Sequence, residues 1–374
     1  MNRKIPHLCP RHMLLFGLLL TVLLLRNVQG GGEFYARHLY PAIGKVLSSF
    51  SDLFPFSVND LFIAFSIGWL IVYPVLARTR RHRDWRTILV RMAEYLAWVY
   101  VWFYAAWGIN YAQPNIYQRL KMSPAAVTTE EFRSFAYRYA DSINACYRIY
   151  RKDGEQKQRI RTGRETPLKK EELGTFVLTE YQQMNSRGMG VNAPFCEKMS
   201  PKTMVFSRFS AMAGVTGSMG PFFCEFTLNS YLLPHDYPFT YAHEYAHRLG
   251  IANEGEANFY AYQVCTASPD GNIRYSAYYH LLGHVLNDVY AILGEKEYEV
   301  YWQHLDKGII RMAEADRAYW KEMRIGIVDR LQGLVYEAYL RGNKVKEGRR
   351  SYSTVIRMLM AWEKKQKEVR RCSF

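Results

Sequence analysis

The stretch "YAHEYAHRLGIANEGEANFYAY", residues 241–262, contains the pattern His-Glu-x-x-His followed by two further glutamates. His243 and His247 are four residues apart, so on a helix they share one face and can bind one metal ion. Glu244 stands where a carboxylate can take a proton from water and pass it to a leaving amine. Gly250 is suited to end the helix. The stretch predicts a zinc site with a glutamate base; an ordinary amphipathic helix is the alternative.

A catalytic zinc site needs a third protein ligand and an open position. The candidates are Glu254 and Glu256, on a second predicted helix with Asn253 as its N-cap. We favour Glu256 because Tyr260 and Val264 lie on the same face, which is the packed side of the helix. The same glutamate could instead complete a capping box with Asn253. Glu254 is the alternative ligand, or an acceptor that orients a histidine.

Two other segments offer candidate groups for the site. "HLLGH" holds a second pair, His280 and His284, with Asp288 one turn further on. It lacks a glutamate base, so surface or core histidines are favoured over a second metal site. His280 is retained as a candidate stabiliser of an oxyanion. Tyr352 is another oxyanion candidate, with helix packing as its alternative role.

The N-terminal third contains three apolar runs that predict a membrane anchor. The candidate transmembrane helices are about residues 13–28, 61–77 and 88–109. The first follows a basic start and is either a retained helix or a cleaved signal peptide. The basic loop 78–87 belongs in the cytoplasm by the positive-inside rule, although buried core helices are the alternative for each run. We therefore expect a membrane anchor over residues 1–110 and an extracytoplasmic domain over residues 111–374.

The predicted outer domain is mainly α with a small β-sheet, an α+β fold of zincin-like type. Residues 151–172 are charged and contain Gly and Pro, which predicts a loop. Residues 203–232 mix Gly with β-branched and aromatic residues, which predicts one or two strands. The remaining helices are expected over about 128–150, 170–185, 275–293, 296–323, 327–340 and 352–369.

Composition limits the partners. The 374-residue chain has a formal net charge of +15, which suits nucleic acid, anionic lipid or acidic polymers. The sequence has no zinc-ribbon, helix-turn-helix or RNA-binding signature, which argues against nucleic acid. None of the six cysteines forms a CxxC pair, so a thiolate zinc site is not expected. The lipid bilayer is the expected partner besides the substrate.

Several segments together resemble an uncharacterised bacterial membrane family, domain-of-unknown-function family 3810, which is common in Bacteroidetes. They are the three apolar runs, "FPFSVNDL", "WGINY", "GVTGSMGPFFCE", "HEYAHRLGIANEGEANFYAY" and "SYSTVIRMLM". The family pattern usually has Gln after the second histidine, where this chain has Arg248. The sequence at 256–259 also resembles the third-ligand helix of gluzincin-type peptidases. That resemblance implies His243, His247 and Glu256 as ligands and Glu244 as base.

We therefore expect a membrane-anchored zinc metallopeptidase at the bacterial inner (cytoplasmic) membrane, multi-pass, with its catalytic domain in the periplasm. Its expected cofactor is zinc, and its expected substrate is a peptide or protein of the cell envelope. The alternative is a non-catalytic membrane receptor or assembly factor with a structural or sensory metal site. A transporter is disfavoured, because only three spans are predicted and their charges lie near a helix end.

Overall fold

The computed structural model of the chain divides into two compact units. It describes residues 10–124, 127–160, 170–195, 200–343 and 354–372. Unit 1 runs to Pro114 and also includes Gly220–Glu225, and unit 2 comprises Asn115–Met219 and everything from Phe226 onward. The first unit thus takes a segment from the region 203–232, which the sequence assigned wholly to the outer domain.

Unit 1 is built from helices. They are α1 (Pro10–Asn27), α2 (Gly31–Phe34), the π-helix η1 (Tyr35–Leu39), α3 (Tyr40–Ser51), α4 (Val58–Thr79), α5 (Trp85–Ala106) and the 3₁₀-helix η2 (Gly108–Ala112). Both α1 and α4 pack against α5. Arg11 donates a hydrogen bond to Glu94 over 3.2 Å, which ties the start of α1 to the half of α5 that follows the α4–α5 turn.

One or two described helices of unit 1 are apolar enough to cross a membrane. Val58–Thr79 passes alone, whereas Pro10–Asn27 and Gly31–Ser51 pass only as a pair that is bent by 108° at its break. The third predicted span corresponds to α5, which is long enough but does not pass. Its charged residues and its many tyrosines and tryptophans lower its mean hydropathy. The described helices therefore support one or two crossings, where the sequence predicted two or three depending on whether the first segment is cleaved.

The tip of the β2–β3 hairpin belongs to unit 1. Rings of Phe222 and Phe223 lie 4.8 and 5.7 Å from the ring of Phe62. The buried carboxylate of Glu225 accepts hydrogen bonds from Ser57 Oγ over 2.8 Å and from the Asn59 amide over 2.7 Å. These donors lie at the start of α4, so Glu225 satisfies one of the amide groups that a helix N-terminus leaves open.

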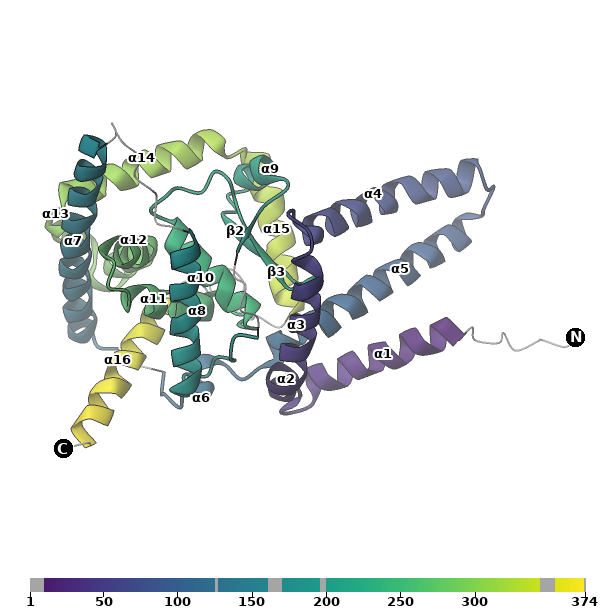
Figure 1. Cartoon of the computed structure of the whole chain (residues 1–374), viewed down its shortest axis with the longest axis horizontal. Coiled ribbons are helices and arrows are strands. Elements are labelled where there is room, and N and C mark those ends of the chain that lie inside the picture. Colours follow the sequence, from purple (N-terminus) through teal and green to yellow (C-terminus); the bar gives the residue numbers. More distant parts are fainter. Residues whose placement is uncertain (1–9, 125–126, 161–169, 196–199, 344–353, 373–374) are drawn as a thin grey trace, which may run out of the picture. The chain divides into compact units, whose positions relative to one another are not determined.

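Unit 2 is mainly helical with a small sheet (Figure 1). Its elements are α6 (Ile116–Arg119), α7 (Thr129–Ile160), α8 (Lys170–Ser186), β1 (Lys202–Thr203), α9 (Ser207–Met212), β2 (Gly217–Gly220), β3 (Glu225–Leu228), α10 (Tyr237–Arg248), α11 (Glu254–Thr266), α12 (Gly271–Asp288), the π-helix η3 (Val289–Leu293), α13 (Glu295–His304), α14 (Lys307–Met323), α15 (Gly326–Gly342) and α16 (Val355–Cys372). The last residue of β2 and the first residue of β3 belong to unit 1.

The three strands form one mixed sheet in the order β1-β3-β2. β1 pairs parallel to β3, with Lys202 opposite Thr227. β2 and β3 are consecutive and are joined by the turn at residues 221–224. β2 is therefore an edge strand among the described residues. This confirms the strands expected within 203–232, although that region also contains the short helix α9.

The core of unit 2 lies around α10, α11 and α12, which pack on one another. Helix α7 covers α12, and α8 and α16 contact α11 (Figure 1). Much of this core is aromatic, and its fully buried tyrosines are Tyr181, Tyr241, Tyr245, Tyr260, Tyr275 and Tyr301. The high tyrosine content of the chain thus serves a packed interior, where these rings bury large areas.

Two expected boundaries are wrong. The predicted loop 151–172 is helical through Ile160 and again from Lys170. Its Lys, Arg, Glu and Gln residues are good helix formers, so charge alone did not indicate a loop. The single helix expected over 296–323 is broken before Asp306, whose side chain accepts a hydrogen bond from the Gly308 amide over 2.8 Å. This N-cap starts α14 as a separate helix.

A pair of helical glycines tests the packing of unit 2. A Cβ at Gly308 would overlap the hydroxyl end of Tyr147, whereas a Cβ at Gly283 would meet nothing within 4 Å. We expect Gly308→Ala to lower the free energy of unfolding by about 1–3 kcal/mol, because the core must shift. Gly283→Ala should raise it by up to about 1 kcal/mol, because alanine favours helix. Chemical unfolding of the full chain measures both, and equal effects would contradict the described α7–α14 packing.

Candidate metal centre

The His-Glu-x-x-His stretch forms α10, as the sequence predicted, and a tight turn follows it. The Ile251 amide donates to Ala246 O over 3.1 Å, and Gly250 has φ +91°. Glycine adopts this left-handed conformation without the penalty that a Cβ brings. Asn253 then caps α11, because its side chain accepts a hydrogen bond from the Glu256 amide over 3.1 Å. The turn therefore brings the start of α11 against the end of α10.

Three potential ligand atoms converge where these two helices meet. Nε2 of His243 and Nε2 of His247 lie 3.0 Å apart. Oε2 of Glu254 lies 3.1 Å from the first and 3.2 Å from the second. Ligands held about 2.0–2.1 Å from a tetrahedral zinc ion would be about 3.3 Å apart. The spacing of the three atoms therefore fits one small divalent ion.

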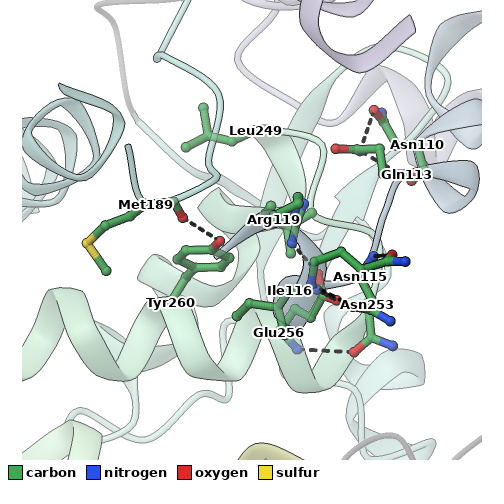
Figure 2. Close-up of polar contacts among 12 residues, drawn as sticks. Asn110, Gln113, Asn115, Ile116, Arg119, Met189, Leu249, Asn253, Glu256 and Tyr260 are labelled. Carbon is green, nitrogen blue, oxygen red and sulfur yellow. Dashed lines mark hydrogen bonds and ion pairs between the residues drawn. The ribbon is translucent and has the colours of Figure 1, made fainter. Parts of the chain in front are cut away.

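Glu256, the third ligand favoured from the sequence, is not in this group of described residues. Figure 2 shows the contacts that it makes instead. Its carboxylate accepts a hydrogen bond from the Ile116 amide over 2.8 Å and forms an ion pair with Arg119. Glu254 and Glu256 are two residues apart, so their side chains leave the helix about 200° apart. The packed face on which that prediction relied is directed to Ile116 and Arg119, whereas the three candidate ligand atoms lie on the other side of α11.

Burial and mutual charge set the protonation of the cluster. Burial would raise the pKa of Glu254, but the charge of His247 and hydrogen bonds from both histidines hold it well below its usual value. Burial would lower the pKa of His247, but the charge of Glu254 raises it to about 9. Burial lowers the pKa of His243 despite its hydrogen bond to Glu254. Glu254 thus presents a carboxylate, and His243 a neutral imidazole, as metal binding requires.

A backbone carbonyl orients one of the two histidines. Nδ1 of His247 donates a hydrogen bond to Ile251 O over 2.6 Å, which leaves Nε2 to face the cluster. Such a contact fixes the tautomer of a metal-binding histidine. His243 differs, because its buried Nδ1 has no hydrogen-bond partner among the described residues.

Glu244 lies against the edge strand β2. A Cβ added at Gly217 would be 2.5 Å from Glu244 Oε1, so glycine is required for this close approach. Burial raises the pKa of Glu244 to about 8, although the charge of His247 and a hydrogen bond from the Met219 backbone oppose the shift. A carboxylate with a pKa near neutrality can both accept and return a proton.

His280 lies close to the cluster, whereas the other secondary candidates do not join it. The ring of Phe239 stacks on His280 at 4.1 Å and lies 6.4 Å from the ring of His243. His280 Nδ1 is 3.7 Å from Asp236 Oδ1. His284 is in neither metal-compatible group of the described residues. Tyr352 lies outside the described residues.

A second group of possible ligands escaped the sequence analysis. His235, Asp236 and Asp316 lie within reach of one ion. Asp316 Oδ2, however, already accepts one hydrogen bond from the Tyr279 hydroxyl over 2.5 Å and lies 2.7 Å from His235 Nε2. Asp316 is 80 residues further along the chain, and no spacing rule joins it to the other two. The hydrogen bonds indicate a network that links α12 and α14 to the start of α10.

Comparison with known proteins gives a family but no activity. The family model described as "Protein of unknown function (DUF3810)" matches residues 35–360. No curated protein and no solved structure matches the chain. The match includes α10 and α11 and therefore all three candidate ligands.

The pH dependence of stability tests the second group. Burial would lower the pKa of His235, but its hydrogen bond to Asp316 and the nearby carboxylates raise it. A histidine whose pKa is raised by folding stabilises most below its unfolded pKa, and this contribution is lost as pH rises through the folded value. We expect His235→Gln to cost more free energy of unfolding at about pH 5.5 than at about pH 8.5.

The matched control is His304→Gln, which removes an exposed pair of His304 Nε2 with Asp141 at 2.8 Å. Exposed pairs contribute little, so this change should have a small effect at both pH values. Equal losses for His235→Gln at the two pH values would contradict a charged His235 in the network.

Proposed function

The chain belongs to the DUF3810 family, and we propose that it is a membrane-anchored zinc metallopeptidase that hydrolyses peptide bonds of a cell-envelope substrate. Its metal ligands are His243, His247 and Glu254. Glu244 is the general base, and His280 assists at the oxyanion. We propose a zincin-like fold for unit 2, because the edge strand of its sheet lies beside the His-Glu-x-x-His helix.

One observation carries this proposal. The two histidines of α10 and Glu254 of α11 place three ligand atoms between 3.0 and 3.2 Å apart, with Glu244 on the same helix. A chance His-Glu-x-x-His pattern would not require a carboxylate from another helix to meet both imidazoles. Two histidines and one carboxylate are the ligand set of many catalytic zinc sites.

The protein groups have separate tasks in the proposed reaction. A bound zinc ion would supply Lewis acidity at the scissile carbonyl. Glu244 takes a proton from the attacking water and returns it to the nitrogen of the leaving amine. His280 donates a hydrogen bond to the oxygen on which negative charge develops.

The edge strand β2 is the proposed docking element for the substrate backbone. An extended peptide can add to an exposed strand edge through main-chain hydrogen bonds. β2 is at the edge of the described sheet, and Gly217 brings it into contact with Glu244. A peptide paired with β2 would therefore pass next to the proposed base.

A non-catalytic receptor or assembly factor remains the second candidate, and one observation favours it. The side chains of His243, His247 and Glu254 are only 12%, 8% and 12% exposed, as a closed structural site would be. A structural zinc site normally has four protein ligands. The cluster found among the described residues has three, which favours catalysis.

The proposed location is the inner membrane, with unit 2 in the periplasm. The apolar helix α4 supports membrane insertion. The basic segment 78–87 favours the cytoplasmic side for the α4–α5 turn. The Arg11–Glu94 contact puts the basic start of α1 near the same end of unit 1. Both basic segments can then lie on one side of the bilayer.

Metal content of the full chain, purified in detergent after zinc loading, tests the ligand set. We expect about one zinc per chain in the wild type and almost none in His243→Ala or Glu254→Ala, because each removes one of three ligands. Glu295→Ala, a change at the start of α13, should keep the metal. A wild type without bound zinc, or a Glu254→Ala variant that keeps it, would overturn this assignment.

Hydrolysis of a mixture of internally quenched peptides and of labelled casein tests the base. Glu244→Gln should keep zinc but lower kcat by about 100- to 10,000-fold, because the amide cannot accept the proton. Glu314→Gln, an exposed change on α14, should leave kcat unchanged. Undiminished hydrolysis in Glu244→Gln would exclude Glu244 as the base. A zinc-loaded wild type that cleaves none of these substrates would favour the receptor or assembly factor.

A further inference from the structure

We propose that Arg119 and Glu256 are positioning residues: their buried ion pair fixes the start of α11 so that Glu254 meets the two histidines. This inference rests on the proposed metal site, but it assigns a role to groups that do not touch the metal. Figure 2 shows the contacts that Arg119 and Glu256 make with their neighbours.

Both carboxylate oxygens of Glu256 are bound by the segment that opens unit 2. Its Oε1 accepts a hydrogen bond from the Ile116 amide over 2.8 Å, and its Oε2 pairs with Arg119. Both side chains are nearly inaccessible, at 7% exposed for Glu256 and 6% for Arg119. Charges buried in this way are stable only while they are paired and hydrogen-bonded. The pair therefore holds α11 against α6 in one arrangement.

A second contact keeps Arg119 over the same helix. Its guanidinium lies 6.0 Å from the ring centre of Tyr260, one turn after Glu256. The Tyr260 hydroxyl donates a hydrogen bond to Met189 O over 2.7 Å, so this ring is itself fixed. Arg119 thus contacts two successive turns of α11. That limits rotation of the helix about its axis.

Rotation of α11 is the motion to which Glu254 is most sensitive. Glu254 is the first residue of the helix and Glu256 the third, and their side chains point about 200° apart. The first turn is thus held on one side by α6 and contacts the histidines on the other. Any rotation that releases Glu256 from Arg119 would carry the Glu254 carboxylate away from Nε2 of His243.

The capping box considered from the sequence explains only half of these contacts. Asn253 does accept a hydrogen bond from the Glu256 amide. The Glu256 carboxylate, however, goes to Ile116 and Arg119 and not back to the N-cap amide. The N-cap hydrogen bond that Asn253 accepts therefore needs neither Arg119 nor the carboxylate of Glu256.

Zinc affinity of the full chain, measured by competition with a chromophoric chelator, is the test. We expect Glu256→Gln to weaken zinc binding about 10- to 100-fold, as the loss of an orienting partner does. The glutamine still accepts from the Ile116 amide. The visible spectrum of bound Co²⁺ should also change in the variant, because it reports ligand geometry. A pair that served stability alone would move neither readout.

Two further variants keep the test decisive. Arg119→Met combined with Glu256→Gln removes both charges and leaves none buried alone, so it should fold even if Glu256→Gln does not. It too should bind zinc more weakly. Tyr301→Phe is the matched control, because it removes a buried hydrogen bond of 3.1 Å to Ala136 O that joins α13 to α7. It should lower thermal stability and leave zinc affinity unchanged.

The outcomes separate this inference from the proposed function. Wild-type zinc affinity and spectrum in both Glu256 variants would overturn the positioning role while the metal site stands. Complete loss of zinc in Glu256→Gln, with Glu254→Ala unaffected, would make Glu256 itself a ligand and would also overturn it. A wild-type chain that binds no zinc would reject the metal site first.

Discussion

The turn at Gly250 is the constraint on which the metal cluster depends. A left-handed residue there lets α11 begin beside the end of α10. The same turn presents Ile251 O to His247 Nδ1, so the backbone that brings in Glu254 also orients a histidine. Without this turn, α11 would not begin beside α10, and the Glu254 carboxylate would not reach the two imidazoles. A short loop thus couples the ligand geometry to the packing of the two helices.

Three buried glutamates on α10 and α11 show how environment divides roles among identical side chains. Glu244 lies against β2, and burial raises its pKa. Glu254 meets two histidines, and their charge and hydrogen bonds lower its pKa. Glu256 pairs with Arg119. The first has a pKa suited to proton exchange, the second has the charge that a cation site needs, and the third binds a neighbouring segment of the chain.

Local patterns predicted the helices of the site, and long-range contacts decided the rest. The positions of His243 and His247 on α10 and the Asn253 cap of α11 follow from spacing and capping rules. Which of Glu254 and Glu256 lies beside the histidines does not follow from such rules, because it depends on α6, more than 130 residues earlier in the chain. Likewise, nothing local joins Asp316 to His235. The apolar runs predicted α4 as a candidate membrane span. The run that forms α5 is long enough to cross a membrane, but it is not apolar enough.

The shared hairpin has a practical consequence for dissecting the molecule. The chain passes between the units at Pro114 and again on either side of Gly220–Glu225. A truncation that begins at Asn115 would therefore keep Phe222 and Phe223 but remove the ring of Phe62 that they contact. It would also remove the Asn59 amide of α4, which donates a hydrogen bond to the Glu225 carboxylate. Soluble expression of the second half alone would expose aromatic surface and a buried carboxylate, which favours aggregation.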